Sequence, residues 1–166
     1  MRLALTLISV LFCLNSMAQI VHVYPDELMR PGDLMASMEN GLVRNGDWRA
    51  PVTLTLHNRK IFQGFSTSSF DLLYTIAEEN GTIQLRRGDG RWSDDVLYTW
   101  FEGQIFMGDS RFALDLVYTV RNHSLDPEIL ELYREDSLSR FDRLAVFEGR
   151  PTPDELLVLI LAQGLL

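Results

Sequence analysis

The sequence predicts a mainly β domain, built as a closed or ring-like array of about six short β-hairpins with one buried helix at the C-terminal end. Three observations predict this fold. A segment of sixteen residues recurs along the chain, glycine-containing turns separate the copies, and an apolar segment with a helix-start signal follows the last copy. The repeats and the helix all follow an apolar segment at the N-terminus. That segment is not part of the predicted domain.

Residues 1–18 have the pattern of a secretory signal peptide. Arg2 precedes the apolar run Leu3–Leu14, and Ser16 and Ala18 place small residues at the −3 and −1 positions of a cleavage site. The apolar run is too short for a transmembrane helix, which needs about 20 residues. We therefore expect an exported protein, periplasmic or extracellular and of bacterial origin.

The expected mature chain is a single domain, residues 19–166, without a transmembrane segment. The one cysteine, Cys13, lies in the signal peptide behind a bulky Phe12, which argues against a lipoprotein and leaves the domain without thiol chemistry or cysteine-ligated metal. Removing Arg2 changes the formal charge from −8 to −9. This acidic balance argues against a nucleic-acid partner. Fourteen of the fifteen basic residues are Arg, and only Lys60 is Lys.

The repeat consists of a short apolar strand, a polar loop and a longer strand. After the loop, apolar and polar residues alternate with period 2, which is typical of a half-buried strand. The copies are Ile61–Ile76, Leu85–Trp100, Ile105–Val120 and Leu132–Phe147, and the weaker Leu42–Leu56 and Val23–Met38.

About twelve short strands leave exposed edges unless the sheet closes. We therefore expect an up-and-down, propeller-like or flower-like ring. An open, twisted antiparallel meander covered by the helix is the alternative. A β-solenoid is disfavoured because hairpin turns join the strands.

Four glycine-containing pairs are expected to form tight turns between the second strand of one copy and the next apolar strand. They are Asn40-Gly41, Asn80-Gly81, Glu102-Gly103 and Glu148-Gly149. The link Arg121–Glu131 is longer, and its Asp126-Pro127 pair is expected to cap a single helical turn.

The C-terminal segment carries a capping box, Thr152-Pro153-Asp154-Glu155, followed by the apolar run Leu156–Ala162. A helix that is apolar on every side is buried. We expect a helix at about 153–163 that packs against the sheet or inside the ring.

The repeat resembles the tandem I-Y-x-G-x-S-x₄-D-x-L-Y-T units of small bacterial exported proteins of unknown function, which also end in an apolar helix. The residues that carry the resemblance are Ile61, Gly64, Ser66, Asp71, Leu73, Tyr74 and Thr75, with Ile105, Gly108, Ser110, Asp115, Tyr118 and Thr119. It covers residues 61–120 closely. The resemblance implies the hairpin-repeat architecture and no catalytic residue.

The repeat loops pair an arginine with an aromatic residue: Trp48-Arg49, Arg91-Trp92, Arg111-Phe112 and Arg140-Phe141. If the loops share one rim, this surface suits a carboxylated glycan or a protein partner, because guanidinium groups fit carboxylates and aromatic faces stack. The competing interpretation is stacking within each loop, or ion pairs with nearby aspartates.

An aspartate recurs at the end of the repeat loop. In a closed ring these carboxylates would suit Ca²⁺ if they converged, with Asp71, Asp95 and Asp115 as the candidates. We favour a structural role instead, in which the side chains accept hydrogen bonds from their own loops. Asp33 and Asp142 complete the set.

The remaining residue types predict no cofactor and no catalytic motif. The Tyr74, Tyr98 and Tyr118 column is interpreted as core with hydroxyl groups at the rim, and His22, His57 and His123 as solvent-facing turn residues. We predict an exported, non-enzymatic binding or structural module. The alternatives are a glycan hydrolase whose carboxylates come from different hairpins, and an inhibitor or assembly partner of another exported protein.

Overall fold

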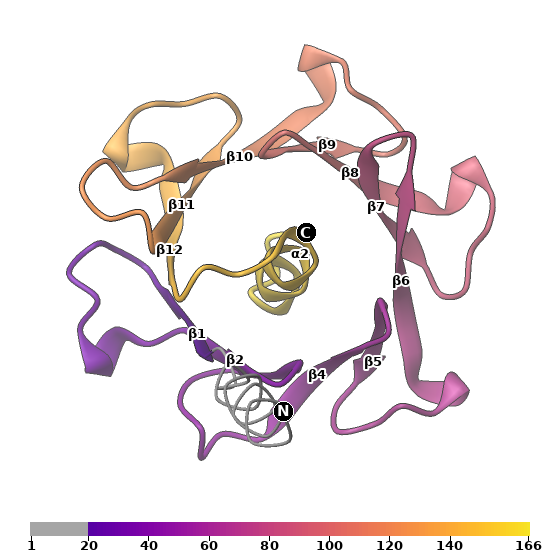
Figure 1. Cartoon of the computed structure of the whole chain (residues 1–166), viewed down its shortest axis with the longest axis horizontal. Helices are drawn as coiled ribbons and strands as arrows, with labels where there is room; N and C mark the ends of the chain where they lie inside the picture. Colours follow the sequence, from indigo (N-terminus) through magenta and orange to yellow (C-terminus); the bar gives the residue numbers. More distant parts are fainter. Residues whose placement is uncertain (1–19) are drawn as a thin grey trace, which may run out of the picture.

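A computed structural model describes residues 20–166, and in it twelve antiparallel strands form a closed barrel around one helix (Figure 1). The predicted ring of six hairpins is confirmed, and the alternative of an open meander is wrong. The barrel closes where β12 pairs with β1, with His22 opposite Glu148. The predicted signal peptide lies outside the described residues.

The strands follow the repeat. They are β1 (Ile20–Tyr24), β2 (Ala36–Glu39), β3 (Leu42–Arg44), β4 (Val52–His57), β5 (Lys60–Gln63), β6 (Leu72–Glu79), β7 (Thr82–Arg87), β8 (Val96–Phe101), β9 (Gln104–Met107), β10 (Leu116–Asn122), β11 (Ile129–Arg134) and β12 (Arg143–Glu148). Five 3₁₀ turns precede even-numbered strands: Pro31–Asp33, Ser69–Asp71, Ser93–Asp95, Ala113–Asp115 and Arg140–Asp142.

Because every strand is antiparallel to its neighbours in sequence, all six long connections leave the same end of the barrel. We call them outer loops 1 to 6: 25–35, 45–51, 64–71, 88–95, 108–115 and 135–142. They project outward around the ring (Figure 1). The tight turns and the link 123–128 lie at the opposite end.

A bulge recurs in five of the six hairpins, shortly after each outer loop. In one hairpin, Ile61 pairs with Tyr74 and Phe62 with Leu72, so that Leu73 has no opposite residue. The Leu73 carbonyl accepts a hydrogen bond of 2.8 Å from the amide of Gly88, the first residue of outer loop 4. Each bulge increases local twist, and this one ties a strand to the next repeat.

Three of the four expected turns have both central residues at positive φ, as tight hairpin turns require; Asn40-Gly41, for example, has φ 51° and 77°. A further such turn, Asn58-Arg59, forms without glycine. Glu148-Gly149 precedes the helix rather than a strand, which corrects our expectation. The link 123–128 also differs from our expectation. The Asp126 carboxylate accepts a hydrogen bond from the Glu128 amide and closes a turn, but no helical turn forms there.

The helix α2 (Pro153–Ala162) lies in the centre of the barrel, as the apolar run predicts (Figure 1). The Thr152 hydroxyl accepts from the Glu155 amide at 3.3 Å, and the Glu155 carboxylate accepts from the Thr152 amide at 2.8 Å. The five consecutive residues Leu156–Ile160 are buried against inward-facing strand residues. In the described part of the chain, no helix is long and apolar enough to span a membrane.

Candidate functional site: the outer loops and the clefts beneath them

The four predicted arginine–aromatic pairs lie in outer loops 2, 4, 5 and 6, and therefore at one end of the barrel. Their aromatic rings face solvent: the exposed fraction is 71% for Trp48, 77% for Trp92, 77% for Phe112 and 92% for Phe141. The core does not use these side chains. These rings are therefore available for contact with a ligand or partner at that end of the barrel.

Stacking within the loop accounts for one pair. The Arg49 guanidinium lies 5.0 Å from the centre of the Trp48 ring. Arg111 instead stacks on Phe101 of β8, at 5.2 Å, and leaves Phe112 free of it. Among the described residues, none of the four arginines, which include Arg91 and Arg140, forms an ion pair.

The recurring aspartates bond within their own loops. Asp71 accepts a hydrogen bond of 2.6 Å from the Ser66 hydroxyl, whose oxygen accepts from the Ser68 amide. Asp115 and Asp142 are bound by a serine in the same way, and the Asp95 carboxylate accepts from the Trp92 amide. Asp33 ends the 3₁₀ turn of outer loop 1. In residues 20–166, none of these aspartates belongs to a group with the spacing of metal ligands.

Sequence reasoning missed the contacts between repeats. Outer loops fold back over the outer face of the preceding hairpin, where acidic loop residues meet basic strand residues. Asp89 pairs with Lys60 at 3.0 Å, Asp136 with Arg121 at 2.7 Å, and Glu27 with Arg143 at 3.2 Å. The signal was present in the fifth column of the repeat, which contains Glu27, Asp89, Asp109 and Asp136.

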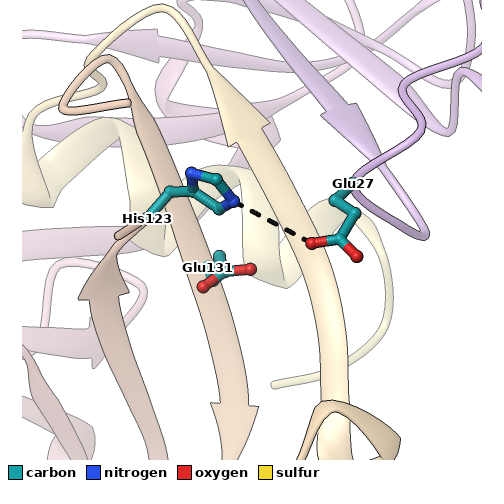
Figure 2. A group of neighbouring side chains, drawn as sticks. All are labelled: Glu27, His123 and Glu131. Carbon is teal, nitrogen blue, oxygen red and sulfur yellow. Dashed lines mark ion pairs between the residues drawn. The ribbon is translucent and has the colours of Figure 1, made fainter. Parts of the chain in front are cut away.

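The contact beneath outer loop 1 closes the ring between the last and first repeats. Arg143 bridges Glu27 and Glu131, at 3.2 and 2.5 Å. The Tyr133 hydroxyl donates to Glu131 at 3.0 Å, and the His123 imidazole lies 3.9 Å from Glu27 (Figure 2). Burial lowers the pKa of Arg143, but its hydrogen bonds to the two glutamates outweigh this and raise the pKa overall.

The side chains of Glu27, His123 and Glu131 have ligand atoms within 4.8 Å of one another, the spacing of a metal site. The Arg143 guanidinium, however, already forms ion pairs with both carboxylates. The arrangement is therefore a salt-bridge network, buried at Arg143 and Glu131 and half-exposed at Glu27, where it joins the two ends of the ring.

Two histidine expectations need correction. His22 lies in β1 rather than in a turn, and the side chain of His123 is only 18% exposed because the first outer loop packs beside it. His57 is exposed, at the end of β4. The tyrosine column packs against the core, and the Tyr118 hydroxyl donates to the Leu165 carbonyl. Burial raises the pKa of Tyr118.

Beneath outer loop 5 the strand position contains a glutamine instead of a charged residue. The Gln84 amide donates to the Asp109 carboxylate at 2.8 Å. A cleft of about 380 Å³ remains, which we call the loop-5 cleft; it is lined by Glu79, Asn80, Thr82, Gln84, Thr99, Asp109, Ser110, Arg111 and Phe112. Beneath outer loop 6 a cleft of about 510 Å³ has an apolar wall that includes Phe106, Leu114 and Leu116.

With this ring of six hairpins established, the comparison with protein-family models agrees with it. A family model described as "6-fold beta flower protein" matches residues 23–150. The chain belongs to this beta-flower family. A solved structure of a protein from Arabidopsis thaliana is also similar, at 16% identity over 89% of each chain and a TM-score of 0.32. No functionally curated protein matches.

The family description names an architecture and no activity, so the chemistry of this beta flower must come from its own side chains. Its repeats share a backbone conformation but differ in the side chains that lie beneath the outer loops. Salt bridges cross the spaces beneath outer loops 1 and 4, whereas open clefts remain beneath outer loops 5 and 6. The features open to a ligand are thus the exposed loop side chains and these two clefts.

Proposed function

We propose that this beta-flower protein is an exported, non-enzymatic binding module that holds a carboxylated polysaccharide through its outer loops. The observation that carries the proposal is the set of guanidinium groups without ion pairs beside exposed aromatic rings at one end of the barrel. Guanidinium groups bind carboxylates as a planar fork, and aromatic side chains offer apolar faces to sugar rings.

Placement on several loops supports a polymeric ligand. Arg91 and Trp92 lie in outer loop 4, Arg111 and Phe112 in outer loop 5, and Arg140 and Phe141 in outer loop 6. Each contact is individually weak at an exposed site. Because the loops are neighbours on one barrel, a repeating chain that engages two or three of them gains affinity through effective concentration. A polymer should therefore bind much more tightly than its monosaccharide.

The polysaccharide test uses residues 19–166, with polygalacturonate and hyaluronan as acidic probes and dextran as the neutral control. We expect salt-sensitive binding to the acidic polymers, and no release of reducing ends if the protein is not a hydrolase. Replacing Arg91, Trp92 and Arg111 with Ala should weaken binding tenfold or more. Leu125→Ala, which truncates an 89% exposed side chain at the opposite end of the barrel, is the control. Absence of binding to every acidic polymer overturns the proposal.

Export has its own test. The full chain is expressed in a bacterial host, and the N-terminus of the protein recovered outside the cytoplasm is sequenced. We expect it to begin at Gln19, after the small residues that match a cleavage site. Recovery of the uncleaved chain in the cytoplasm alone contradicts export.

A protein partner is the second candidate, favoured by the number of exposed apolar side chains. Nine of the twelve large hydrophobic residues exposed in the described chain lie in outer loops. They are Leu28, Trp48, Phe65, Phe70, Trp92, Phe112, Leu114, Leu138 and Phe141. Cross-linking through a photoreactive residue at position 138 in the native host, followed by identification of one exported partner and a binding measurement with that purified partner, tests this candidate.

A further inference from the structure

We propose that the loop-5 cleft binds a single pyranose residue. This inference rests on the proposed function, because the sugar would be one residue of the polysaccharide that the outer loops hold. The cleft lies between the barrel wall and outer loop 5, and its volume of about 380 Å³ is near the lower end of the range for small-molecule sites, roughly 300–1,000 Å³. This size suits one sugar ring.

The floor of the cleft is polar and fixed before any ligand arrives. Gln84 is only 4% exposed, and both ends of its amide are bound. Its nitrogen donates to Asp109 at 2.8 Å, and its oxygen accepts from the Arg86 guanidinium at 3.1 Å. Arg86 in turn pairs with Glu79 at 2.6 Å. A chain of four side chains is thereby held in place, which reduces the entropy lost on binding.

The mouth of the cleft combines an aromatic face with hydrogen-bonding groups. Phe112 is 77% exposed and lines the cleft, and its amide donates to the Ser110 hydroxyl at 3.2 Å, which fixes the loop beside it. Arg111 lies against Phe101 and lines the same cleft. A pyranose ring has an apolar face for the phenyl ring and hydroxyl groups for the amide, hydroxyl and carboxylate groups around it.

The positive and negative charges of the cleft lining balance, which favours a ligand that binds through hydroxyl groups over a small ion. Glu79 is neutralised by Arg86, and Arg111 and Asp109 contribute opposite charges. A neutral hexose fits this balance, and a uronate fits if its carboxylate reaches Arg111. The two sugars share the ring and its hydroxyl groups, so that the experiment needs one arm for each.

The other repeats show why this cleft is distinctive. Beneath outer loop 4 the corresponding space is crossed by the Lys60–Asp89 salt bridge, and beneath outer loop 1 by Arg143. The clefts beneath outer loops 2 and 3 are smaller, about 120 and 170 Å³, and the cleft beneath outer loop 6 is larger, about 510 Å³, with an apolar wall. Gln84 is shorter than a lysine or arginine and uncharged, and the loop-5 cleft therefore combines open volume with a polar floor.

The test is a ¹⁵N NMR titration of residues 19–166 with methyl β-glucopyranoside in one arm and methyl β-glucuronide in the other, both at millimolar concentration. We expect shifts of the Gln84 side-chain amide and of the backbone amides of 109–112. Phe112→Ala should weaken the binding tenfold or more. Leu125→Ala, which truncates an exposed side chain at the opposite end of the barrel, should leave it unchanged.

The inference is overturned if neither sugar shifts these signals, or if Phe112→Ala leaves the affinity unaltered. Because Phe112 is exposed, the variant is expected to fold, and its thermal melting curve verifies this. Polymer binding that persists when neither monosaccharide binds the loop-5 cleft overturns the inference and leaves the proposed function standing. Monosaccharide binding in the cleft without binding of any acidic polymer supports the inference and overturns the proposed function.

Discussion

The hydroxyl of Thr99 donates a hydrogen bond of 2.7 Å to the carbonyl of Gly108, which joins the barrel wall to outer loop 5. The same bond occurs in three other repeats, from Ser37 to Gly46, Thr55 to Gly64 and Thr75 to Gly88. At the fifth position the Thr119 hydroxyl is buried, and no partner for it exists in the described part of the chain. Glu135 occupies the loop position that glycine has in the other four repeats.

This contrast predicts different costs for one substitution at two equivalent sites. Thr99→Val removes a hydrogen bond from a residue that is 1% exposed, and should lower the free energy of unfolding by about 1 kcal/mol. Thr119→Val removes a hydroxyl group that has no hydrogen-bond partner among the described residues, and should leave the free energy of unfolding unchanged or raise it. Urea denaturation of both variants measures the difference. Equal losses at the two sites would contradict the role assigned to the Thr99–Gly108 bond.

The fold could be predicted because its determinants lie within single repeats. Period-2 alternation identified the strands, and paired residues such as Asn80-Gly81 identified turns whose φ values are both positive. The capping box at Thr152 and Glu155 located the helix to within a residue of its observed ends. The Asn58-Arg59 turn was harder to predict because it contains no glycine, and Arg59 adopts φ 59° although L side chains seldom do.

The clefts could not be predicted because each joins two repeats. The acidic residue recurs in one column, but its partner is Lys60 in one cleft, Gln84 in another and Arg121 in a third. These partners come from β5, β7 and β10. A column alignment shows what every copy needs for its own fold, and it does not show which side chain of the preceding copy lies beneath a loop. Exposure of the loop aromatics likewise depends on how the loops bend away from the barrel.

The salt bridge that closes the ring should contribute far more than its counterpart beneath outer loop 6. Arg143→Met leaves Glu131, with a side chain that is 9% exposed, as a buried charge without a cation, which costs about 3–5 kcal/mol. Arg121→Met leaves Asp136, which is 72% exposed, and should cost within about 1 kcal/mol. Chemical denaturation of both variants measures these losses.

A double variant separates the buried charge from lost packing at Arg143. Adding Glu131→Gln to Arg143→Met removes the unpaired charge, and should therefore recover most of the lost stability. If the double variant is no more stable than Arg143→Met alone, packing of the arginine rather than charge pairing accounts for its effect.

Two glycines with nearly the same φ should respond differently to alanine. Gly41 and Gly81 have φ of 77° and 76° in equivalent turns. A Cβ at position 81 meets nothing within 4 Å, whereas a Cβ at position 41 would lie 2.3 Å from the Leu56 carbonyl oxygen. Gly81→Ala should cost about 1–2 kcal/mol from backbone strain alone. Gly41→Ala must also displace a strand and should cost a further 1–3 kcal/mol, roughly. Thermal unfolding of the pair gives both values, and similar melting temperatures would disprove the close approach.

The tyrosines predict how stability changes in alkaline solution. Burial is the main cause that raises the pKa of Tyr24, Tyr118 and Tyr133 in the folded barrel. An acid whose pKa is higher in the folded than in the unfolded state contributes its full stability below the unfolded value, about 10, and loses it as pH rises through the folded value. Unfolding in urea should therefore become easier above about pH 10.

Replacing the three tyrosines with Phe tests this origin directly. Each Phe retains the buried ring but has no proton to lose, so the triple variant should keep a nearly constant free energy of unfolding between about pH 9 and pH 11, where the parent protein loses stability. Its value at neutral pH should be lower, because the hydroxyl bonds from Tyr118 to Leu165 and from Tyr133 to Glu131 are lost. An unchanged alkaline slope would assign the effect to other groups. A slope that disappears ties the alkaline limit of the barrel to the same hydroxyl groups that anchor the C-terminal segment and the ring-closing salt bridge.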